Sequence, residues 1–353
     1  MTPVKTYLVS LLNGKFLPYN GKKCDWGRLV SIAARSKVSA LLFHIVRDRQ
    51  KDLSIPDEVY QQLQEKYRMN LFRNTLLLEE FEKLRTAFAA AGIEIIVLKG
   101  MFFLHVVYQA RIGVRRMEDV DFLVKAANVE KARHLIGSLG YRNFDTREKN
   151  APSGESTAAM FLKHDKDQSV FMPLHLHWGL SNVSMPLLRK QASGVDVEEI
   201  WDAGVRIDKN KDNLFMMPPE QMFTALCEHG MRHGFARLNI LYDLHAFVLA
   251  YRDSLDWQEI AALGRQWGLV LPIYMGVSLI KELFSTPVPE DFLSTLRPQG
   301  MSLLEKYFFT YAKNNDFPRE DACVLLYLAI QKGFFNKIKA ISAGVRWKAA
   351  KSF

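Results

Sequence analysis

The sequence predicts an α+β protein in which a small mixed β-sheet core is flanked by N-terminal and C-terminal helical regions. The sheet is predicted because short segments rich in β-branched residues recur through the middle of the chain, separated by turn residues. The helices are predicted because apolar residues recur at helical spacing on both sides of that stretch. We therefore expect an N-terminal helical region at 1–91, an α/β core at 92–215 and a C-terminal helical region at 216–353.

The composition fits a folded protein and argues against several other classes. With 353 residues, of which 48% are apolar, the chain can bury a full core. No apolar run reaches the roughly 18 residues of a membrane span, and no signal-peptide pattern is visible, so a cytoplasmic location is expected. The cysteines Cys24, Cys227 and Cys323 are far apart, which predicts buried thiols and neither a disulfide framework nor a zinc cluster.

The N-terminal region is predicted to be helical throughout. Residues 26–46 carry apolar side chains at helical spacing, and Asp25 is the expected N-cap. Pro56 is suited to open a long second helix, which Gly92 would end. His44 lies on the apolar face of the first segment and is interpreted as a partly buried histidine of the core or of an interface.

The core is predicted from strand and helix signals that alternate along the chain. Its expected strands are short apolar segments bounded by turn residues, at 93–98, 119–124, 141–144, 158–162 and 169–178. A short apolar helix at 101–108 separates the first two strands, and a helix capped by Asn128 and ended by Gly140 follows the second. The last two strands flank a turn and predict a β-hairpin that completes a mixed sheet.

The C-terminal region again shows helical spacing from Pro218 onward, with Asp256 as an expected N-cap. Its tail, residues 332–353, carries lysines and arginines without any acidic residue, interleaved with aromatic and aliphatic side chains. This pattern predicts peripheral contact with an anionic surface or an acidic partner. The alternative is a helix that packs on the protein and exposes its basic face.

Asp119 and Asp121 are the strongest candidates for a functional site. They alternate with apolar residues along an expected strand and therefore project from the same face. Two adjacent carboxylates repel each other unless a cation or a proton lies between them. Mg²⁺ takes one or two protein carboxylates and completes its shell with water and phosphates. The pair predicts a metal site, the alternative being an ordinary strand start beside a basic loop.

Four residues that precede Asp119 and Asp121 in the chain are candidates for phosphate binding. Gly100 would let the backbone and the amides of the next helix approach an anion, and Lys99 would add a positive charge. Arg115 and Arg116 lie four and three residues before Asp119 and could clamp a triphosphate. The alternative for the two arginines is a solvated turn.

Three histidines and an aspartate are candidates for a polar cleft: His177, His229, His233 and Asp243. His177 shares one face of the last expected strand with His175, and it is also explained as a hydrogen-bonded structural residue. His229 and His233 lie one helical turn apart, so a buried hydrogen-bond network is the alternative to a cleft. A zinc-protease helix would carry Glu after its first histidine, and Gly230 in that place argues against this class.

The order strand, Lys-Gly turn, short helix, Arg-rich loop and Asp-x-Asp strand resembles the nucleotidyltransferase superfamily that includes DNA polymerase β. More narrowly, LKG, then Tyr108, RRMEDVDFLV and LHLHW resemble the bacterial uncharacterised nucleotidyltransferase family. Its members read approximately LKG, an Arg-rich loop, D-[IV]-D-[LF]-L-V and a later L-H-W. The resemblance continues through His229, His233 and the segment LYDL at 241–244. It covers most of the chain, with the region from Lys99 to Val124 as its most specific part.

The resemblance implies a nucleotidyltransferase core that uses Mg²⁺ or Mn²⁺ and moves a nucleoside monophosphate from a nucleoside triphosphate to an acceptor. The acceptor would be a hydroxyl, or an amine, of a small molecule or a protein. Asp119 and Asp121 would hold the metal, and Lys99, Gly100 and an arginine would hold the phosphates. The chain departs from the superfamily in having Lys-Gly where a Gly-Ser turn is usual.

A second departure concerns the third carboxylate that related enzymes carry on a later strand. The match places it near His175, and this chain has no acidic residue there. Either His175 acts as a ligand or base, or Glu155, Asp165 or Asp167 substitutes, or catalysis is weakened. The last possibility makes a binding or scaffold protein the main alternative to an enzyme. Nucleic acid is the least favoured partner, because the net charge of +9 suits any anion and no RNA-binding strand is visible.

Overall fold

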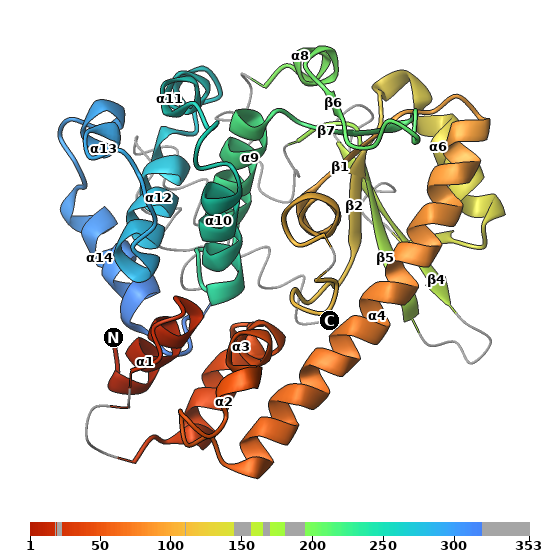
Figure 1. Cartoon of the computed structure of the whole chain (residues 1–353). Coiled ribbons are helices and arrows are strands. Elements are labelled where there is room, and N and C mark those ends of the chain that lie inside the picture. Colours follow the sequence, from red (N-terminus) through yellow and green to blue (C-terminus); the bar gives the residue numbers. More distant parts are fainter. Residues whose placement is uncertain are drawn as a thin grey trace. The chain divides into compact units, whose positions relative to one another are not determined.

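A computed structural model describes residues 1–17, 19, 23–109, 111–144, 157–164, 170–180 and 195–319 (Figure 1). These described residues contain thirteen α-helices and a seven-stranded mixed sheet, which confirms the predicted α+β class. Glu155, Asp165, Asp167 and the basic tail at 332–353 lie outside them. The chain divides into two compact units, which are Met1–Met69 with Gly113–Arg115 and Phe223–Phe353, and Asn70–Ile112 with Arg116–Met222. They are called unit 1 and unit 2 and are described separately.

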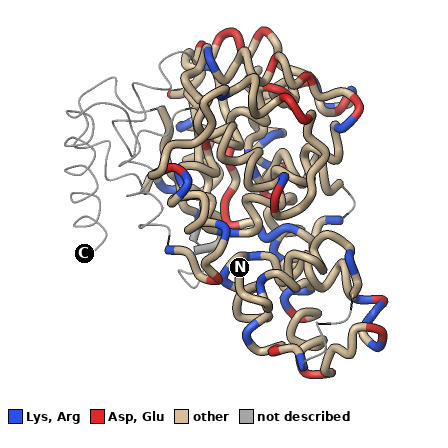
Figure 2. The backbone as a smooth tube through the Cα atoms, turned by 90° about the vertical axis from the view of Figure 1, so that its left-hand side faces the viewer, with Lys and Arg blue, Asp and Glu red and all other residues tan. Residues whose placement is uncertain are grey.

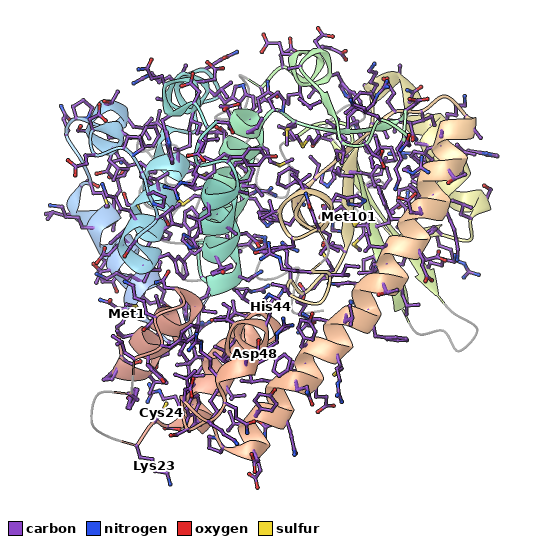
Figure 3. The ribbon with its side chains drawn as sticks, viewed as in Figure 1. Met1, Lys23, Cys24, His44, Asp48 and Met101 are labelled. Carbon is purple, nitrogen blue, oxygen red and sulfur yellow. The ribbon has the colours of Figure 1, made fainter. Side chains whose placement is uncertain are left out.

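The N-terminal part of unit 1 is helical, as predicted. It contains α1 (Pro3–Leu12), α2 (Trp26–Arg35), α3 (Ser39–Val46) and the beginning of α4 (Asp57–Ala90). Asp25 accepts a hydrogen bond from the backbone N–H of Arg28 at 2.9 Å and so caps α2 as expected. His44 on α3 (Figure 3) stacks on Tyr67 with the ring centroids 6.2 Å apart, and both rings are half-buried.

The single helix expected over residues 26–46 is in fact two helices. Lys37 adopts a left-handed φ of 58° directly after α2. The backbone N–H of Val38 then turns back to the carbonyl of Ala33 at 2.8 Å, which is a typical helix ending. The chain therefore changes direction before α3 begins.

The C-terminal part of unit 1 is also helical. It contains α9 from Phe223 onward, and then α10 (Leu238–Ala250), α11 (Trp257–Gln266), α12 (Val270–Phe284), α13 (Phe292–Leu296) and α14 (Leu303–Asn314). The whole of α9 spans Pro219–Arg232. Asp256 caps α11 through the backbone N–H groups of its first turn, as expected. A Cβ at Gly276 would lie 3.3 Å from atoms of Cys227 and Leu244, so this glycine lets α12 pack closely against α9 and α10.

Unit 2 is built around the mixed sheet, whose strand order is β3-β4-β5-β2-β1-β7-β6. The strands are β1 (Ile95–Val97), β2 (Val120–Leu123), β3 (Arg142–Asn143), β4 (Ala158–His164), β5 (Val170–His177), β6 (Val205–Arg206) and β7 (Leu214–Met216). β2 pairs in parallel with β5, β1 pairs in parallel with β7, and the other neighbours are antiparallel. The hairpin of β4 and β5 was predicted, whereas β6 and β7 beside β1 were not.

The helices of unit 2 cover this sheet and set the positions of its strand ends. The later part of α4 packs on the sheet through Phe88, whose ring centroid lies 5.7 Å from that of Phe122 on β2. The helix α5 (Lys99–Phe102) follows β1 and continues as a π-helical turn, Phe103–Val107, in place of the regular helix expected at 101–108. The remaining helices are α6 (Val129–Ser138) and α8 (Val197–Asp202). Asn128 precedes α6 but its side chain makes no capping hydrogen bond.

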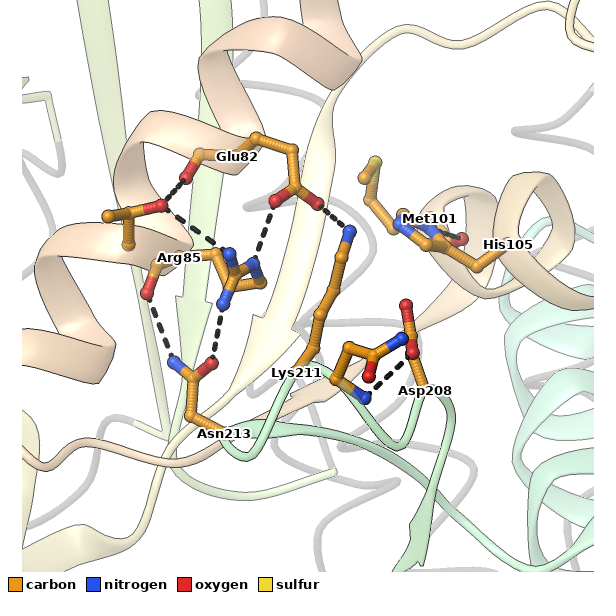
Figure 4. A network of polar contacts seen from close by, with 9 residues as sticks. Glu82, Arg85, Met101, His105, Asp208, Lys211 and Asn213 are labelled. Carbon is orange, nitrogen blue, oxygen red and sulfur yellow. Dashed lines mark hydrogen bonds and ion pairs between the residues drawn. The ribbon is translucent and has the colours of Figure 1, made fainter.

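Charged residues of both signs are interspersed along the described chain (Figure 2). In unit 2 one network of them surrounds Arg85 on α4 (Figure 4), which donates to Glu82 at 2.8 Å and to Asn213 at 3.0 Å. Lys211 donates to the same Glu82 at 2.6 Å, so this network ties α4 to the segment before β7. Among the helices of the described residues, none combines the length and the apolar character that crossing a bilayer requires.

Candidate functional site

Asp121 lies in the middle of unit 2, on the strand between β1 and β5, and only 1% of its side chain is exposed. Lys99, just after β1, forms an ion pair with its Oδ1 atom. Nε2 of His177 lies 2.9 Å from the same oxygen, and Nδ1 of His175 lies 3.4 Å from it. Three nitrogen-bearing side chains therefore converge on one oxygen of a buried carboxylate.

Asp119 lies next to this group, one residue before β2. Its side chain is 39% exposed, and its Oδ2 lies 3.6 Å from Nδ1 of His175. The pairing of β2 with β5 sets Asp121 opposite His175. His175 thus lies beside both carboxylates. The structure brings together five of the residues that the sequence singled out, namely Lys99, Asp119, Asp121, His175 and His177.

Lys99 reaches Asp121 from an unusual backbone conformation. Its φ is 43°, a left-handed value that costs a residue with a side chain on the order of 1 kcal/mol or more. The turn from β1 into α5 is therefore strained where the ammonium is aimed at the carboxylate. The sequence suggested a phosphate as the partner of Lys99, and in this structure its partner is Asp121. Gly100, the next residue, is buried within α5.

The charges of this cluster shift the pKa values of its members in different directions. Burial alone would raise the pKa of Asp121, but the Lys99 ammonium and the two histidines outweigh burial and hold that pKa well below its usual range. Burial would lower the pKa of His175, but Asp121 and Asp119 outweigh it, so this pKa is raised. Burial dominates at His177, and its pKa falls to about 4 despite the contact with Asp121.

The low pKa of His177 keeps its imidazole neutral near pH 7, and the contact with Asp121 then determines which ring nitrogen carries the proton. A neutral imidazole carries one N–H, and the Nε2 atom beside the Asp121 carboxylate must hold it in order to donate a hydrogen bond. The other nitrogen, Nδ1, then carries a lone pair. It is buried and has no hydrogen-bond partner among the described residues. Buried polar atoms in proteins are nearly always hydrogen-bonded, so a water or another ligand is expected at this nitrogen.

Asp121, His175 and His177 together could hold a metal ion. One ligand atom from each of these residues lies within 4.8 Å of the others. The group offers one carboxylate and two imidazoles, and Asp119 lies beside it with a second, more exposed carboxylate. Mixed nitrogen and oxygen donors of this kind suit first-row transition metals as well as harder cations.

The two arginines of the basic loop differ from each other. Arg115 belongs to unit 1 and pairs with Asp243 on α10, with Nε 3.2 and 3.0 Å from the two carboxylate oxygens and Nη2 2.9 Å from Oδ2. Arg116 belongs to unit 2 and is half exposed, and its Nη2 lies 3.5 Å from Glu118. Arg115 thus has a buried carboxylate as partner, while Arg116 is in contact with solvent.

His229 lies on α9 and His233 directly follows the end of that helix, both in unit 1, which also contains Asp243 and Arg115. Their rings meet edge to face with centroids 4.7 Å apart, which agrees with the predicted spacing of one helical turn. Both side chains are half-buried.

Sequence reasoning missed two residues on α4 that contact the loop before Asp119. Arg73 and Asn74 donate hydrogen bonds to backbone carbonyls of this loop. No sequence motif marks them, because their partners are backbone atoms about 40 residues further along the chain. Only the placement of α4 against the sheet reveals them.

A protein-family model described as "Uncharacterised nucleotidyltransferase" matches residues 22–285. The match spans about three quarters of the chain and includes every candidate residue described above. Neither a curated protein nor a solved structure matches the chain.

Proposed function

The chain belongs to the uncharacterised nucleotidyltransferase family, and we propose that it transfers a nucleoside monophosphate from a nucleoside triphosphate to an acceptor hydroxyl or amine. The acceptor would belong to a small molecule or a protein. The observation that carries the proposal is the buried Asp121, which shares a strand face with the more exposed Asp119 and lies against His175. Phosphoryl transfer depends on charges held in fixed positions, and this cluster holds two carboxylates in that way.

A divalent metal fits Asp119, Asp121 and His175. The polar contacts that described residues make with the Asp121 carboxylate all reach Oδ1, which leaves Oδ2 for a cation. Asp119 is partly exposed, so water and substrate phosphates can complete the coordination shell. The imidazole of His175 suits Mn²⁺ better than Mg²⁺. We therefore propose Mg²⁺ or Mn²⁺, with the mixed donor set favouring Mn²⁺.

When bound, such an ion would neutralise the triphosphate and the charge that develops at the transferred phosphorus. Lys99 and His175 would act on the substrates directly. Lys99 is 20% exposed and can move its ammonium from Asp121 to a phosphate oxygen. The acceptor oxygen forms the new bond to the α-phosphorus as the bond to pyrophosphate breaks. When Asp119 and Asp121 alone hold the ion, neutral His175 accepts the acceptor's proton, and when His175 is itself a ligand, the proton passes to water. Because the nearby carboxylates raise the pKa of His175, its neutral form is a stronger base than a free imidazole.

The variants Asp119→Asn and Asp121→Asn test this proposal. Each keeps the shape of the side chain and removes its charge, so metal-dependent triphosphate binding should be lost. We would titrate Mn²⁺ and Mg²⁺ with each of the four ribonucleoside triphosphates by calorimetry. The control is Asp256→Asn, because asparagine also caps a helix and α11 should persist. If both site variants bind metal and nucleotide like the parent, the proposed site is wrong.

The second candidate function is a binding or scaffold protein that keeps the fold with weakened catalysis. It is favoured by His175, which lies opposite Asp121 where related enzymes would be expected to carry a carboxylate, and by Lys99, which already balances the charge of Asp121. The same titration separates the two candidates. A scaffold would bind its ligand equally well with a chelator present and would be insensitive to Asp119→Asn.

A further inference from the structure

Arg73 on α4 holds the backbone directly before Asp119. Its Nε donates a hydrogen bond to the carbonyl of Met117 at 2.9 Å, and its Nη2 donates to the carbonyl of Glu118 at 3.0 Å. A planar guanidinium can serve two successive carbonyls because its N–H groups form a rigid fork. The Glu118 carbonyl belongs to the peptide that joins Glu118 to Asp119. The two hydrogen bonds therefore fix the plane of the peptide that precedes the Cα atom of Asp119.

Asn74, the next residue of α4, fixes the other end of the same loop. It is completely buried, and its Nδ2 donates to the carbonyl of Ile112 at 2.6 Å. Both contacts lie within unit 2. Two consecutive residues of one helix thus hold the points where the basic loop begins and where it ends.

Other residues of α4 also pack this helix in unit 2. Further along the helix, Phe81, Leu84 and Phe88 are completely buried, and Phe88 contacts Phe122 of β2. Among the described residues, no carboxylate pairs with Arg73, and its guanidinium serves only the carbonyls of Met117 and Glu118. The charged side chain of Arg73 thus donates to neutral backbone carbonyls, directly before the Asp119 carboxylate of the candidate site.

We propose that Arg73 is a positioning residue, which sets the place of the Asp119 carboxylate through the two carbonyls it holds. This inference rests on the proposed function, since Asp119 is there a metal ligand. Groups that orient metal ligands without touching the metal typically contribute about 10- to 100-fold to metal affinity or activity. A displacement of a reacting group by about 1 Å can cost on the order of 10²-fold in rate.

The test is Arg73→Lys, which keeps the positive charge and removes the fork. Its matched control is Arg85→Lys on the same helix, where the guanidinium makes the same kind of fork to Glu82 and Asn213, away from the loop (Figure 4). We would measure the affinity for Mn²⁺ alone and the hydrogen exchange of the backbone amides at 118–121 in metal-free protein. We would also measure kcat and KM for the triphosphate.

For Arg73→Lys we expect about tenfold weaker Mn²⁺ binding, faster exchange at 118–121, and a lower kcat with a nearly unchanged KM. For Arg85→Lys we expect parental Mn²⁺ affinity and parental exchange in that segment. Parental values in Arg73→Lys, or equal losses in both variants, would overturn the inference. If the parent binds neither Mn²⁺ nor a triphosphate, the proposed function has failed. The exchange comparison then still decides whether Arg73 holds this segment.

Discussion

Asp121 and Asp243 are both buried aspartates that pair with a basic side chain, yet their partners are arranged in opposite ways. On α10 in unit 1, the guanidinium of Arg115 contacts both oxygens of Asp243, at 2.9 to 3.2 Å. On β2 in unit 2, Lys99 and two histidines all approach the single atom Oδ1 of Asp121. Both oxygens of Asp243 therefore have a partner, whereas the three partners of Asp121 all lie at Oδ1.

This difference distinguishes a structural ion pair from a binding site. A guanidinium fork matches the geometry of a carboxylate and satisfies both of its oxygens, so little is gained by exchanging it for another cation. A lysine is a compact charge on a flexible stem, and a metal ion can replace it at an oxygen. Lys99 also holds its position at the expense of a strained backbone, which is a recurrent feature of functional sites. The contrast leads to three predictions.

The largest effect is expected from removing the cation at each aspartate, with Lys99→Met and Arg115→Met. Each change leaves a buried carboxylate without its main counter-charge, which typically destabilises a protein by about 3–5 kcal/mol. Saturating Mn²⁺ should restore much of the stability of Lys99→Met, since a ligand at 100 times its Kd adds about 2.7 kcal/mol. It should restore none in Arg115→Met. Chemical denaturation with Mn²⁺ and with a chelator measures both.

Lys99→Met should also bind Mn²⁺ alone more tightly than the parent, because the ammonium no longer competes for Asp121. An equal response of the two variants to Mn²⁺ would remove the distinction between the sites. Weaker Mn²⁺ binding in Lys99→Met than in the parent would show that the lysine supports metal binding and does not compete with it.

The parts of the site that follow from local periodicity could be predicted from sequence. Alternation along a strand placed Asp119 and Asp121 on one face and His175 and His177 on one face, and the structure has both arrangements. Local periodicity could not give the pairing of Asp121 with His175, because strand register depends on contacts 54 residues apart in the chain, and only the family resemblance placed His175 near the two aspartates. The left-handed turn at Lys99 carries no composition signal, since such turns usually favour glycine.

The same division applies to the fold. The buried strands and the capped helices were predicted because their signals lie within a few residues of each other. The strands β6 and β7 were missed, since they are two and three residues long and pair with each other and with the distant β1. The pair of Arg115 and Asp243 was missed for the same reason, since the two residues are 128 positions apart in the chain. Tertiary packing decides such contacts.

A smaller effect is expected at His245, a second buried histidine. Its Nδ1 atom has a hydrogen-bond partner, whereas Nδ1 of His177 has none among the described residues. The hydroxyl of Thr286 donates to the carbonyl of Ile280 at 2.9 Å, so Nδ1 of His245 must donate to Thr286 at 2.9 Å. Burial lowers the pKa of His245 to about 4. The ordinary pKa is about 6.5, so the unfolded chain binds more protons than the folded protein between these values. Stability should therefore fall as the pH is lowered through this window.

At pH 5 this histidine should reduce the free energy of unfolding by about 2 kcal/mol relative to pH 7 or above. His245→Gln keeps a hydrogen-bond donor for Thr286 and cannot titrate. Its loss of stability between pH 7 and pH 5, measured by urea denaturation, should be smaller than that of the parent by about this amount. Mn²⁺ should not change the difference between the two proteins. An identical pH dependence in both would show that His245 is not held neutral by burial.

The smallest effect on stability is expected at Arg116, the exposed neighbour of Arg115. It faces Glu118 at 3.5 Å, and the two side chains are 52% and 45% exposed. Exposed pairs of this kind contribute between 0 and about 1 kcal/mol, so Arg116→Ala should leave the free energy of unfolding within that range. Because the fold is preserved, any change in ligand binding can be attributed to the lost guanidinium.

If Arg116 contacts the triphosphate, Arg116→Ala should weaken triphosphate binding about tenfold, since a hydrogen bond to a charged group contributes about 1.5–3 kcal/mol. Binding of Mn²⁺ alone should not change, which separates Arg116 from the metal cluster and from Lys99. The control is Glu118→Ala, which breaks the same surface pair and keeps the arginine. Equal losses in the two variants would mean that the loop itself is disturbed. Parental triphosphate affinity in Arg116→Ala would show that Arg116 is a solvated turn residue. Other residues would then have to hold the phosphates.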